Sequence, residues 1–544
     1  MSHVKSEGLP TVGVTQELTE GEPVYPRYIT SMMSASIPVV IGVGDIKNRS
    51  TRLEDAVEPL ELMLQAIAAA LKDTGISAQD AQTLQRSIDS ISIVANWTWP
   101  YPNTPELLAN RLGCKANYLH ESHHGGNAPA ELFDEASRRI ASGQSKVAVV
   151  TGGEALASLG AFQAAKKFPP PGWTHVDDTT SIWERTRKSN LSSNYGLGLP
   201  TQVYAMYEAA LRAHRGQSPA ENHRESSELY AEYARVAAQN PIAWSHGKEA
   251  DTADAIGKIT KRNRMICLPY PLVMNAFNNV NMSAACIITS LEYARQLRIP
   301  ESQLIFPLGG AGTHDYEHFW ERSSFHSSRS LSSCLDATLA VSNVKTDDID
   351  LYDFYSCFPI VPKLASLHLG IPIYGSKRPT TLLGGLTSFG GAGNNYSMHA
   401  ITEMVRQLRQ GNGRIGLVLA NGGVLSHHHA VCLSRHPRGD GAPYPNRNPL
   451  PRHISDAQPP IAESVQGSAR IETYTVQYDR DGSPLAGFVL GRLDDNGSRF
   501  IAITTDGSTL KDLGSSTEQV GKSIWVGWDQ ETRRNTFKIL GSKI

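Results

Sequence analysis

Two adjacent histidines stand directly before a glycine pair and an asparagine, His123-His124-Gly125-Gly126-Asn127, at the predicted start of a helix. An imidazole titrates near neutral pH, so one of them could take a proton from a substrate. Adjacent side chains of an extended segment point to opposite sides, so we expect at most one histidine to face a ligand and the other to lie on the surface. The backbone N–H groups of Gly125, Gly126 and Asn127 could stabilise an oxyanion, although these residue types also build turns and helix caps.

Histidines also form the run His427-His428-His429. Three consecutive residues of a strand cannot all face one ion, and no acidic or cysteine partner lies nearby in the sequence, so no metal site is predicted. His428 could enter a site, whereas the other two fit the surface. The pair His314-Asp315 could orient a substrate or join two domains.

Amides and one thiol complete the candidate chemistry. Asn275, Asn278, Asn279 and Asn281 form a cluster of amides, which can polarise a carbonyl group without titrating but also satisfy buried turns. Cys357 could act as a nucleophile, or it could be a buried thiol that packs as a small apolar residue.

The elements that must position these residues follow an α/β pattern. From Ser36, apolar runs of strand length alternate with amphipathic stretches, the first being Pro38–Val43 and Ala56–Leu71. Such alternation is typical of a sheet covered by helices. The helix after Asn127 is expected to end at Gly143.

A unit of helix end, strand and glycine pair occurs twice. It runs from Gly143 to Gly152 and again from Gly413 to Gly422, nine residues in each case. The second copy follows a helix opened by Gly393-Asn394. We interpret the two copies as halves of a duplicated βαβ structure.

Composition excludes several classes of protein. The chain has 544 residues and a formal charge of −2 with no basic stripe, so nucleic acid is not an expected partner. The longest apolar runs, such as Ile37–Val43, are far shorter than the roughly 20 residues of a membrane span. The polar start Met1–Tyr25 lacks the features of a signal peptide, and six dispersed cysteines predict reduced thiols.

The remaining segments differ in composition. Residues 168–265 carry helical stretches and are predicted to form an inserted cap or substrate loop. Residues 437–466 are rich in Pro, Gly, Arg and Asn and are predicted to be a linker. Residues 467–544 alternate short strands with turns at Asp481-Gly482 and Asn496-Gly497, which predicts a small β-barrel-like domain.

Seven segments occur in an order that is similar to the thiolase superfamily, in particular to acetyl-CoA acetyltransferase-like and sterol-carrier-protein-type thiolases. The resemblance covers about Ser36 to Ser434. The segments are Val39–Gly44, the helix-strand-Gly-Gly-Glu run ending at Glu154, Asn240–Ala243, Met274–Ala276, Tyr355–Phe358, Gly384–Asn395 and Ala420–Gly423.

This resemblance implies an αβαβα double half-fold that binds CoA thioesters at the junction of its halves, usually as a homodimer. The N-terminal half is assigned to residues 36–300, with the cap inside it, and the C-terminal half to residues 301–436. Residues 1–35 are predicted to be a flexible arm.

The chemistry of the family needs a thiolate, a base and oxyanion donors. The resemblance puts its nucleophilic cysteine at Gly126, its histidine at Gly391 and its second cysteine at Ala420. A polar and an acidic residue of the family correspond to Tyr355 and Ser356. With these groups replaced together, ordinary thiolysis is not expected.

We therefore predict an acyltransferase that uses a CoA thioester as acyl donor without the usual nucleophilic cysteine. The alternatives are a non-catalytic acyl-CoA-binding or scaffold protein and, third, a peroxisomal thiolase or lipid-transfer role. The predicted catalytic residues are His123, His124, Cys357, Tyr355, Ser356 and His428. The predicted substrate- and oxyanion-binding residues are Gly125, Gly126, Asn127, Asn275, Asn279, Gly391, Asn394 and Asn421.

Partners and location follow from the same interpretation. The expected partners are an acyl-CoA, a small-molecule acceptor and a second copy of the chain, with no permanently bound cofactor and no metal. The last residues, Ser542-Lys543-Ile544, resemble the Ser-Lys-Leu peroxisomal signal, so the protein is expected in peroxisomes or, alternatively, in the cytoplasm.

Overall fold

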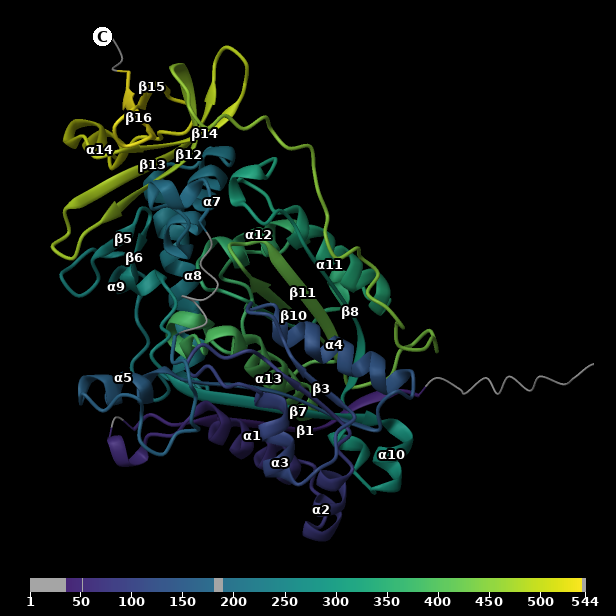
Figure 1. The fold of residues 1–544 in the computed structure, drawn as a ribbon. Helices are drawn as coiled ribbons and strands as arrows, with labels where there is room; N and C mark the ends of the chain where they lie inside the picture. The colour runs from purple at the N-terminus through teal and green to yellow at the C-terminus, as the bar shows by residue number, and fades with distance from the viewer. Residues whose placement is uncertain (1–35, 51, 181–188, 541–544) are drawn as a thin grey trace, which may run out of the picture. The chain divides into compact units, whose positions relative to one another are not determined.

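The described part of the chain comprises residues 36–50, 52–180 and 189–540 of a computed structural model. The predicted arm, 1–35, and the tripeptide Ser542–Ile544 lie outside these residues. Figure 1 shows two sheets with helices between and around them, and a further β structure formed by the C-terminal strands.

The first sheet has the strand order β1-β7-β4-β2-β3. β7 is antiparallel to both β1 and β4, whereas β2 is parallel to β4 and β3. β4 is buried along its whole length, as expected for a strand covered by helices on both faces. The strands are β1 Pro38–Lys47, β2 Ser90–Ile93, β3 Tyr118–Glu121, β4 Val147–Ala155 and β7 Asn281–Ser290.

The second sheet has the order β8-β11-β10-β9 and resembles the first in connectivity. β11 is antiparallel to β8 and β10, and β9 is parallel to β10. Its strands are β8 Phe306–His314, β9 Leu351–Phe354, β10 Ile415–Gly422 and β11 His427–Ser434.

Two helices, α4 (Ala128–Ala141) and α13 (Tyr396–Gln410), lie between the sheets and contact strands of both. α1 (Pro59–Asp73) packs on the outer face of the first sheet, and α11 (Arg329–Ser342) on that of the second. These layers confirm the predicted αβαβα architecture. The other helices of the halves are α2 Ala78–Arg86, α3 Thr104–Leu112, α5 Leu156–Ala164, α10 Leu291–Gln296 and α12 Ile360–Leu369.

The predicted cap contains α7 (Pro200–His214), α8 (Pro219–Gln239) and the short α9 (Ala253–Gly257). α8 begins at Pro219, directly after its N-cap residue Ser218. Ser218 accepts a hydrogen bond from the Glu221 backbone N–H, and the Glu221 carboxylate accepts one from the Ser218 N–H. This reciprocal cap satisfies the first turn of the helix.

The C-terminal strands form a closed ring in the order β12-β13-β14-β16-β15, with β15 paired to β12. The predicted β domain is therefore present, and it also contains a helix, α14. Two short strands of the cap, β5 and β6, extend its sheet through the pairing of Cys267 with Gln477. The bounds are β5 Met265–Cys267, β6 Tyr270–Pro271, β12 Gly467–Tyr478, β13 Pro484–Leu493, β14 Arg499–Thr504, α14 Gly507–Leu513, β15 Ser523–Asp529 and β16 Arg534–Ile539.

The predicted linker follows the edge of the second sheet. Asn448 donates to the Gly312 carbonyl and accepts from the Gly312 N–H, at 2.7 and 3.0 Å. Further along, the His314 N–H donates to the Arg452 carbonyl, and the Ile454 N–H donates to the His314 carbonyl. The linker is therefore hydrogen-bonded to the Gly312–His314 end of β8.

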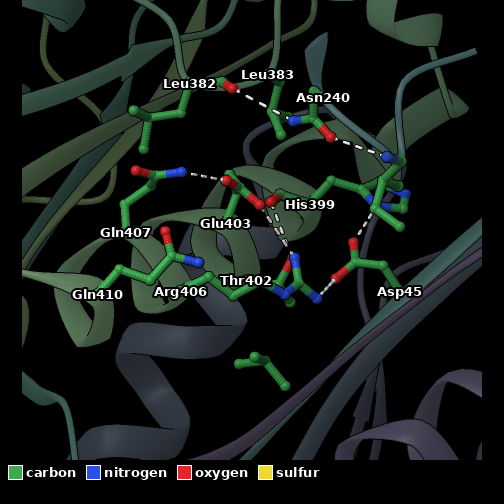
Figure 2. Close-up of polar contacts among 12 residues, drawn as sticks. Asp45, Asn240, Leu382, Leu383, His399, Thr402, Glu403, Arg406, Gln407 and Gln410 are labelled. Carbon is green, nitrogen blue, oxygen red and sulfur yellow. Dashed lines mark hydrogen bonds and ion pairs between the residues drawn. The ribbon is translucent and has the colours of Figure 1, made fainter. Parts of the chain in front are cut away.

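Each central helix is joined to the opposite sheet by an aspartate–histidine pair. Asp134 of α4 accepts a hydrogen bond of 2.7 Å from His429 of β11. His399 of α13 donates to Asp45 of β1 at 2.5 Å, and Arg406 also contacts Asp45 (Figure 2). Both aspartate side chains are almost completely buried.

Candidate functional site

The start of α4 meets the end of β10, as the resemblance to thiolases implies. A Cβ placed on Gly126 would lie 2.5 Å from the Asn421 carbonyl oxygen and 2.7 Å from Tyr355 Oη. The Tyr355 hydroxyl therefore occupies space next to Gly126 that a cysteine side chain would need. Burial, together with the nearby Cys357, raises the pKa of Tyr355 well above its usual value, so the hydroxyl stays protonated and can donate.

The side chain of His124, two residues before Gly126, is half-buried, whereas that of His123 is exposed. The Asn394 amide nitrogen donates to the Ala95 carbonyl at 2.7 Å and lies 3.2 Å from His124 Nδ1. Because Nδ1 accepts this hydrogen bond, the neutral imidazole carries its proton on Nε2 and donates there. Burial lowers the pKa of His124, which favours this neutral form at pH 7.

At Gly391, in the loop before α13, an amide from the segment before β7 lies where the resemblance would put the family's histidine. The Gly391 N–H donates to the Phe277 carbonyl at 2.7 Å, and a Cβ on Gly391 would overlap the side-chain oxygen of Asn278. Asn275 is turned away, because its amide nitrogen donates to the Pro271 carbonyl at 2.7 Å. Asn279 is exposed. The space at Gly391 is thus filled by an amide that does not titrate.

Cys357 lies beside Asn421 rather than at the start of α4. The Asn421 amide nitrogen is 3.9 Å from Cys357 Sγ and donates to Tyr204 Oη at 2.8 Å. Burial raises the pKa of the Cys357 thiol to about 12, so very little thiolate forms at neutral pH. Ser356 is fully buried, and its carbonyl accepts a hydrogen bond from Tyr230.

The buried carboxyl group of Glu154 holds the loop segment that contains Trp97, and Trp97 contacts His124. Glu154, at the end of β4, accepts hydrogen bonds from the Trp97 and Thr98 N–H groups and from the Thr98 hydroxyl. Burial raises the pKa of Glu154 to about 8 despite these donors. The Trp97 ring in turn stacks on His124, with ring centroids 5.3 Å apart. Glu154 is therefore a positioning residue for the imidazole.

The structure does not bring the remaining predicted residues to this position. His428 is fully buried, and its Nδ1 lies 3.1 Å from the Ser330 hydroxyl of α11. Asp315 pairs with Arg322 at 2.7 Å and accepts from Ser330, which agrees with the structural interpretation of the His314-Asp315 pair.

Asn127 occupies the N-cap position of α4 without a side-chain capping hydrogen bond, and it reaches toward the second half, since a Cβ on Gly422 would overlap its side-chain oxygen. With Gly125, Gly126, Asn394 and Asn421 it lies at the junction of the halves. In the part of the chain that the structure describes, no group of three His, Cys, Asp or Glu residues could hold a metal ion. No helix among the described residues is long and apolar enough to cross a membrane.

Sequence reasoning missed Tyr204 and Trp97. Tyr204 is in the middle of α7, where an aromatic residue reads as core, yet its hydroxyl accepts from Asn421 and from the Leu425 N–H and contacts the Gly423 carbonyl. Trp97 is in a loop between β2 and α3. No motif marked either residue, because Tyr204 reaches the site only when the cap packs on the halves, and Trp97 reaches His124 from a separate loop of the N-terminal half.

Comparison with known proteins identifies the class. A family model described as the thiolase-like protein type 1 additional C-terminal domain matches residues 449–531. The Ltp2-ChsH2(DUF35) aldolase is 19% identical with a TM-score of 0.56, covering 74% of this chain and 98% of its own. Acetyl-CoA acetyltransferase from Syntrophomonas wolfei is 14% identical with a TM-score of 0.53, covering 74% and 99%. These two share the fold, which is that of the thiolase superfamily.

A nearer relative defines the family. The structure of an SCP2-thiolase-like protein type 1 from Mycobacterium smegmatis is 30% identical, with a TM-score of 0.74, and the match covers 93% of this chain and 99% of that one. The chain belongs to the family of SCP2-thiolase-like proteins type 1. A search of curated proteins gave no match. The relative is described as monomeric, so the expected homodimer gains no support and stays a prediction.

Proposed function

We propose that this protein binds an acyl-CoA thioester at the junction of its halves and transfers the acyl group directly to a small-molecule acceptor. The observation that carries the proposal is the Tyr355 hydroxyl beside Gly126, where a protonated donor stands in place of a nucleophilic thiol. The fold of thiolases that act on CoA thioesters supports the choice of acyl donor.

The donors at this position suit a carbonyl group that gains negative charge. Tyr355 Oη and the protonated Nε2 of His124 would donate to the thioester oxygen, together with backbone N–H groups at the start of α4. The acceptor attacks the carbonyl carbon, the C–S bond breaks, and the acceptor's proton passes to the departing CoA thiolate.

A covalent route is disfavoured by the thiols. Neither Gly126 nor Ala420 has one, and the pKa of Cys357, about 12, leaves it protonated. We therefore expect no acyl-enzyme to accumulate.

The direct test combines product release with intact mass. The purified chain is incubated with acyl-CoAs of increasing chain length and with alcohol, amine and thiol acceptors, while CoA release and protein mass are recorded. Direct transfer predicts CoA release without added mass, and nearly full turnover in Cys357→Ala. An acyl mass retained on Cys357 would instead establish covalent catalysis.

Tyr355→Phe tests the donor, and Tyr396→Phe provides a matched control. The two rings lie 5.5 Å apart and both are buried, but only Tyr355 adjoins Gly126. Loss of one oxyanion donor should lower turnover by about 100-fold to 1,000-fold in Tyr355→Phe and little in the control. Equal effects would refute the role of Tyr355.

A second candidate is a non-catalytic acyl-CoA-binding protein. It is favoured by the same hydroxyl, because Tyr355 and Asn278 fill the spaces at Gly126 and Gly391 that catalytic side chains would use. Acyl-CoA binding without CoA release for any acceptor would select this function.

A further inference from the structure

The turn between β10 and β11 contains a leucine in the left-handed region of backbone conformation. Leu425 has a φ of 63°, a value that bulky side chains rarely adopt, and its side chain is completely buried. Such a strained residue persists only where the surrounding structure fixes it. The turn, residues 422–426, directly follows Asn421 at the junction of the halves. Backbone strain is therefore located beside the candidate site.

One hydroxyl group of the cap holds this turn. Tyr204 Oη accepts hydrogen bonds from the Leu425 N–H at 3.0 Å and from the Asn421 amide nitrogen at 2.8 Å. It donates to the Gly423 carbonyl at 3.2 Å. These three bonds use its one proton and both of its lone pairs. Burial raises the pKa of Tyr204 well above its usual value, so the proton stays on the oxygen.

The ring of Tyr204 is packed as tightly as its hydroxyl is bonded. It is 1% exposed and stacks on Phe358, with ring centroids 4.7 Å apart. From the C-terminal half, Arg322 adds a contact to the same turn by donating to the Val424 carbonyl at 3.1 Å. Tyr204 belongs to α7, so its side chain joins the cap to a strained turn of the C-terminal half.

The segment that Tyr204 holds lies against the start of α4. The Asn421 carbonyl oxygen would be 2.5 Å from a Cβ on Gly126, and a Cβ on Gly422 would be 3.1 Å from the Gly126 nitrogen. Because the two backbones approach this closely, a shift of residues 421–422 changes the space around Gly126.

We infer that Tyr204 is a positioning residue, whose hydroxyl holds the strained turn and thereby sets the spacing between residues 421–422 and the start of α4. The inference rests on the proposed function only for its consequence in acyl transfer. Tyr204→Phe leaves the Leu425 N–H and the Asn421 amide without their acceptor, so Leu425 can relax out of the left-handed region. The end of β10 then moves relative to Gly126.

Two control variants accompany Tyr204→Phe. Tyr207→Phe removes a buried hydroxyl from the same helix, and this hydroxyl has no hydrogen-bond partner among the described residues. Tyr474→Phe removes a buried hydroxyl that accepts from Arg212 of α7 at 3.1 Å, so it breaks a hydrogen bond of the cap that does not involve the turn.

The first measurement is amide hydrogen exchange on the full chain, for residues 421–426 and 124–128. Tyr204→Phe should speed exchange about tenfold or more in both segments, because a buried donor loses its acceptor and the start of α4 loses a fixed neighbour. Both controls should stay within about threefold of wild type. Faster exchange in residues 421–426 alone would overturn the inference. So would an increase spread evenly over the chain and matched by Tyr474→Phe.

The second measurement separates kcat from KM in acyl transfer. A misplaced site should lower kcat about tenfold or more in Tyr204→Phe and leave the KM for acyl-CoA within about threefold, with both controls close to wild type. A raised KM with unchanged kcat would show that Tyr204 serves binding and not positioning.

The two proposals fail separately. A wild-type protein that releases no CoA refutes the transfer reaction, and the exchange measurement still decides the role of Tyr204. Unchanged exchange and unchanged turnover in Tyr204→Phe refute only the positioning role.

Discussion

α4 and α13 occupy equivalent places in the two halves, yet their buried charges are satisfied differently. In α4 the helix supplies the carboxylate, and Asp134 accepts from Arg138, His429 and Tyr444 at 2.5–2.7 Å. Burial opposes ionisation, but His429, Arg138 and Tyr444 outweigh it and lower the pKa of Asp134. One of these donors, Tyr444, comes from the predicted linker.

In α13 the helix supplies the histidine, and the carboxylate belongs to β1. Asp45 accepts from His399 and Arg406, and Arg406 also pairs with Glu403 at 3.2 Å (Figure 2). His399 Nε2 is buried without a hydrogen-bond partner among the described residues. Among the described residues, no residue of the linker donates a hydrogen bond to Asp45. The two halves therefore satisfy their buried carboxylates with different contacts.

The starts of the two helices differ as well. α4 begins next to His124 and Gly126, whereas the segment before α13 holds Gly391 against the Asn278 amide. Groups able to donate to a substrate carbonyl are therefore concentrated at one helix, and the other supplies Asn394 to orient them.

The largest expected effect comes from removing either carboxylate. Asp134→Ala should lower the free energy of unfolding by about 3–5 kcal/mol, because it leaves a buried histidine and arginine uncompensated. Asp45→Ala should cost less, since Arg406 is 26% exposed and keeps Glu403 as a partner. Urea unfolding, with midpoints and m values compared, measures both. A larger loss in Asp45→Ala would contradict the ranking of the two clusters.

The next effect concerns the helix starts. His124→Ala should lower turnover by about 100-fold to 1,000-fold through loss of an oxyanion donor, whereas Asn278→Ala should have a much smaller effect. Acyl-CoA affinity measured by calorimetry should change by less than about threefold in either variant. If His124 acts as a donor, activity persists below pH 6, whereas a base at this position would lose activity as it protonates. Full turnover in His124→Ala would remove it from the mechanism.

The pH dependence of the free energy of unfolding should report on Asp45, which pairs with His399 and Arg406 of α13. Burial opposes ionisation of Asp45, but Arg406 and His399 outweigh it and lower its pKa to about 2. In the unfolded chain an aspartate has a pKa of about 3.9, so the lower pKa of Asp45 in the folded protein stabilises the fold at pH values above this. This stabilisation of about 2 kcal/mol disappears as the pH falls from 4 to 2. Urea unfolding at pH 5, 4 and 3 should therefore fall more steeply in wild type than in Asp45→Asn. Parallel curves would show that Asp45 titrates normally.

The smallest effect tests whether the linker stabilises α4. Tyr444→Phe removes one donor to Asp134 and should lower the free energy of unfolding by about 1.5 kcal/mol. Tyr316→Phe is the matched control, since its hydroxyl contacts the Asp456 carbonyl nearer the surface. Equal losses of unfolding free energy in the two variants would mean that the hydrogen bond from Tyr444 to Asp134 stabilises the protein no more than the contact of Tyr316.

The sequence was most informative where a local pattern determines structure. Glycine at Gly143 and Gly413, apolar periodicity and paired turn residues predicted both halves and the β domain. It missed the two short strands β5 and β6, because strands of two or three residues have no recognisable period.

The candidate site was only partly predictable for a related reason. The resemblance predicts that Gly126 stands in place of a cysteine, but the hydroxyl beside Gly126 comes from Tyr355, more than two hundred residues away. The tautomer of His124 depends on Asn394, which belongs to the other half. Such contacts arise only from the packing of distant segments.

The hydrogen bonds between the linker and β8 also affect whether two molecules can pair through the edges of their sheets. β8 is an outer strand of its sheet, and an outer strand with open N–H and C=O groups can recruit a strand from another molecule and start polymerisation. Asn448 and residues 452–454 already use these groups from Gly312 to His314. The chain thus occupies the Gly312–His314 end of its own sheet edge, so these backbone groups are not open to a strand of another molecule.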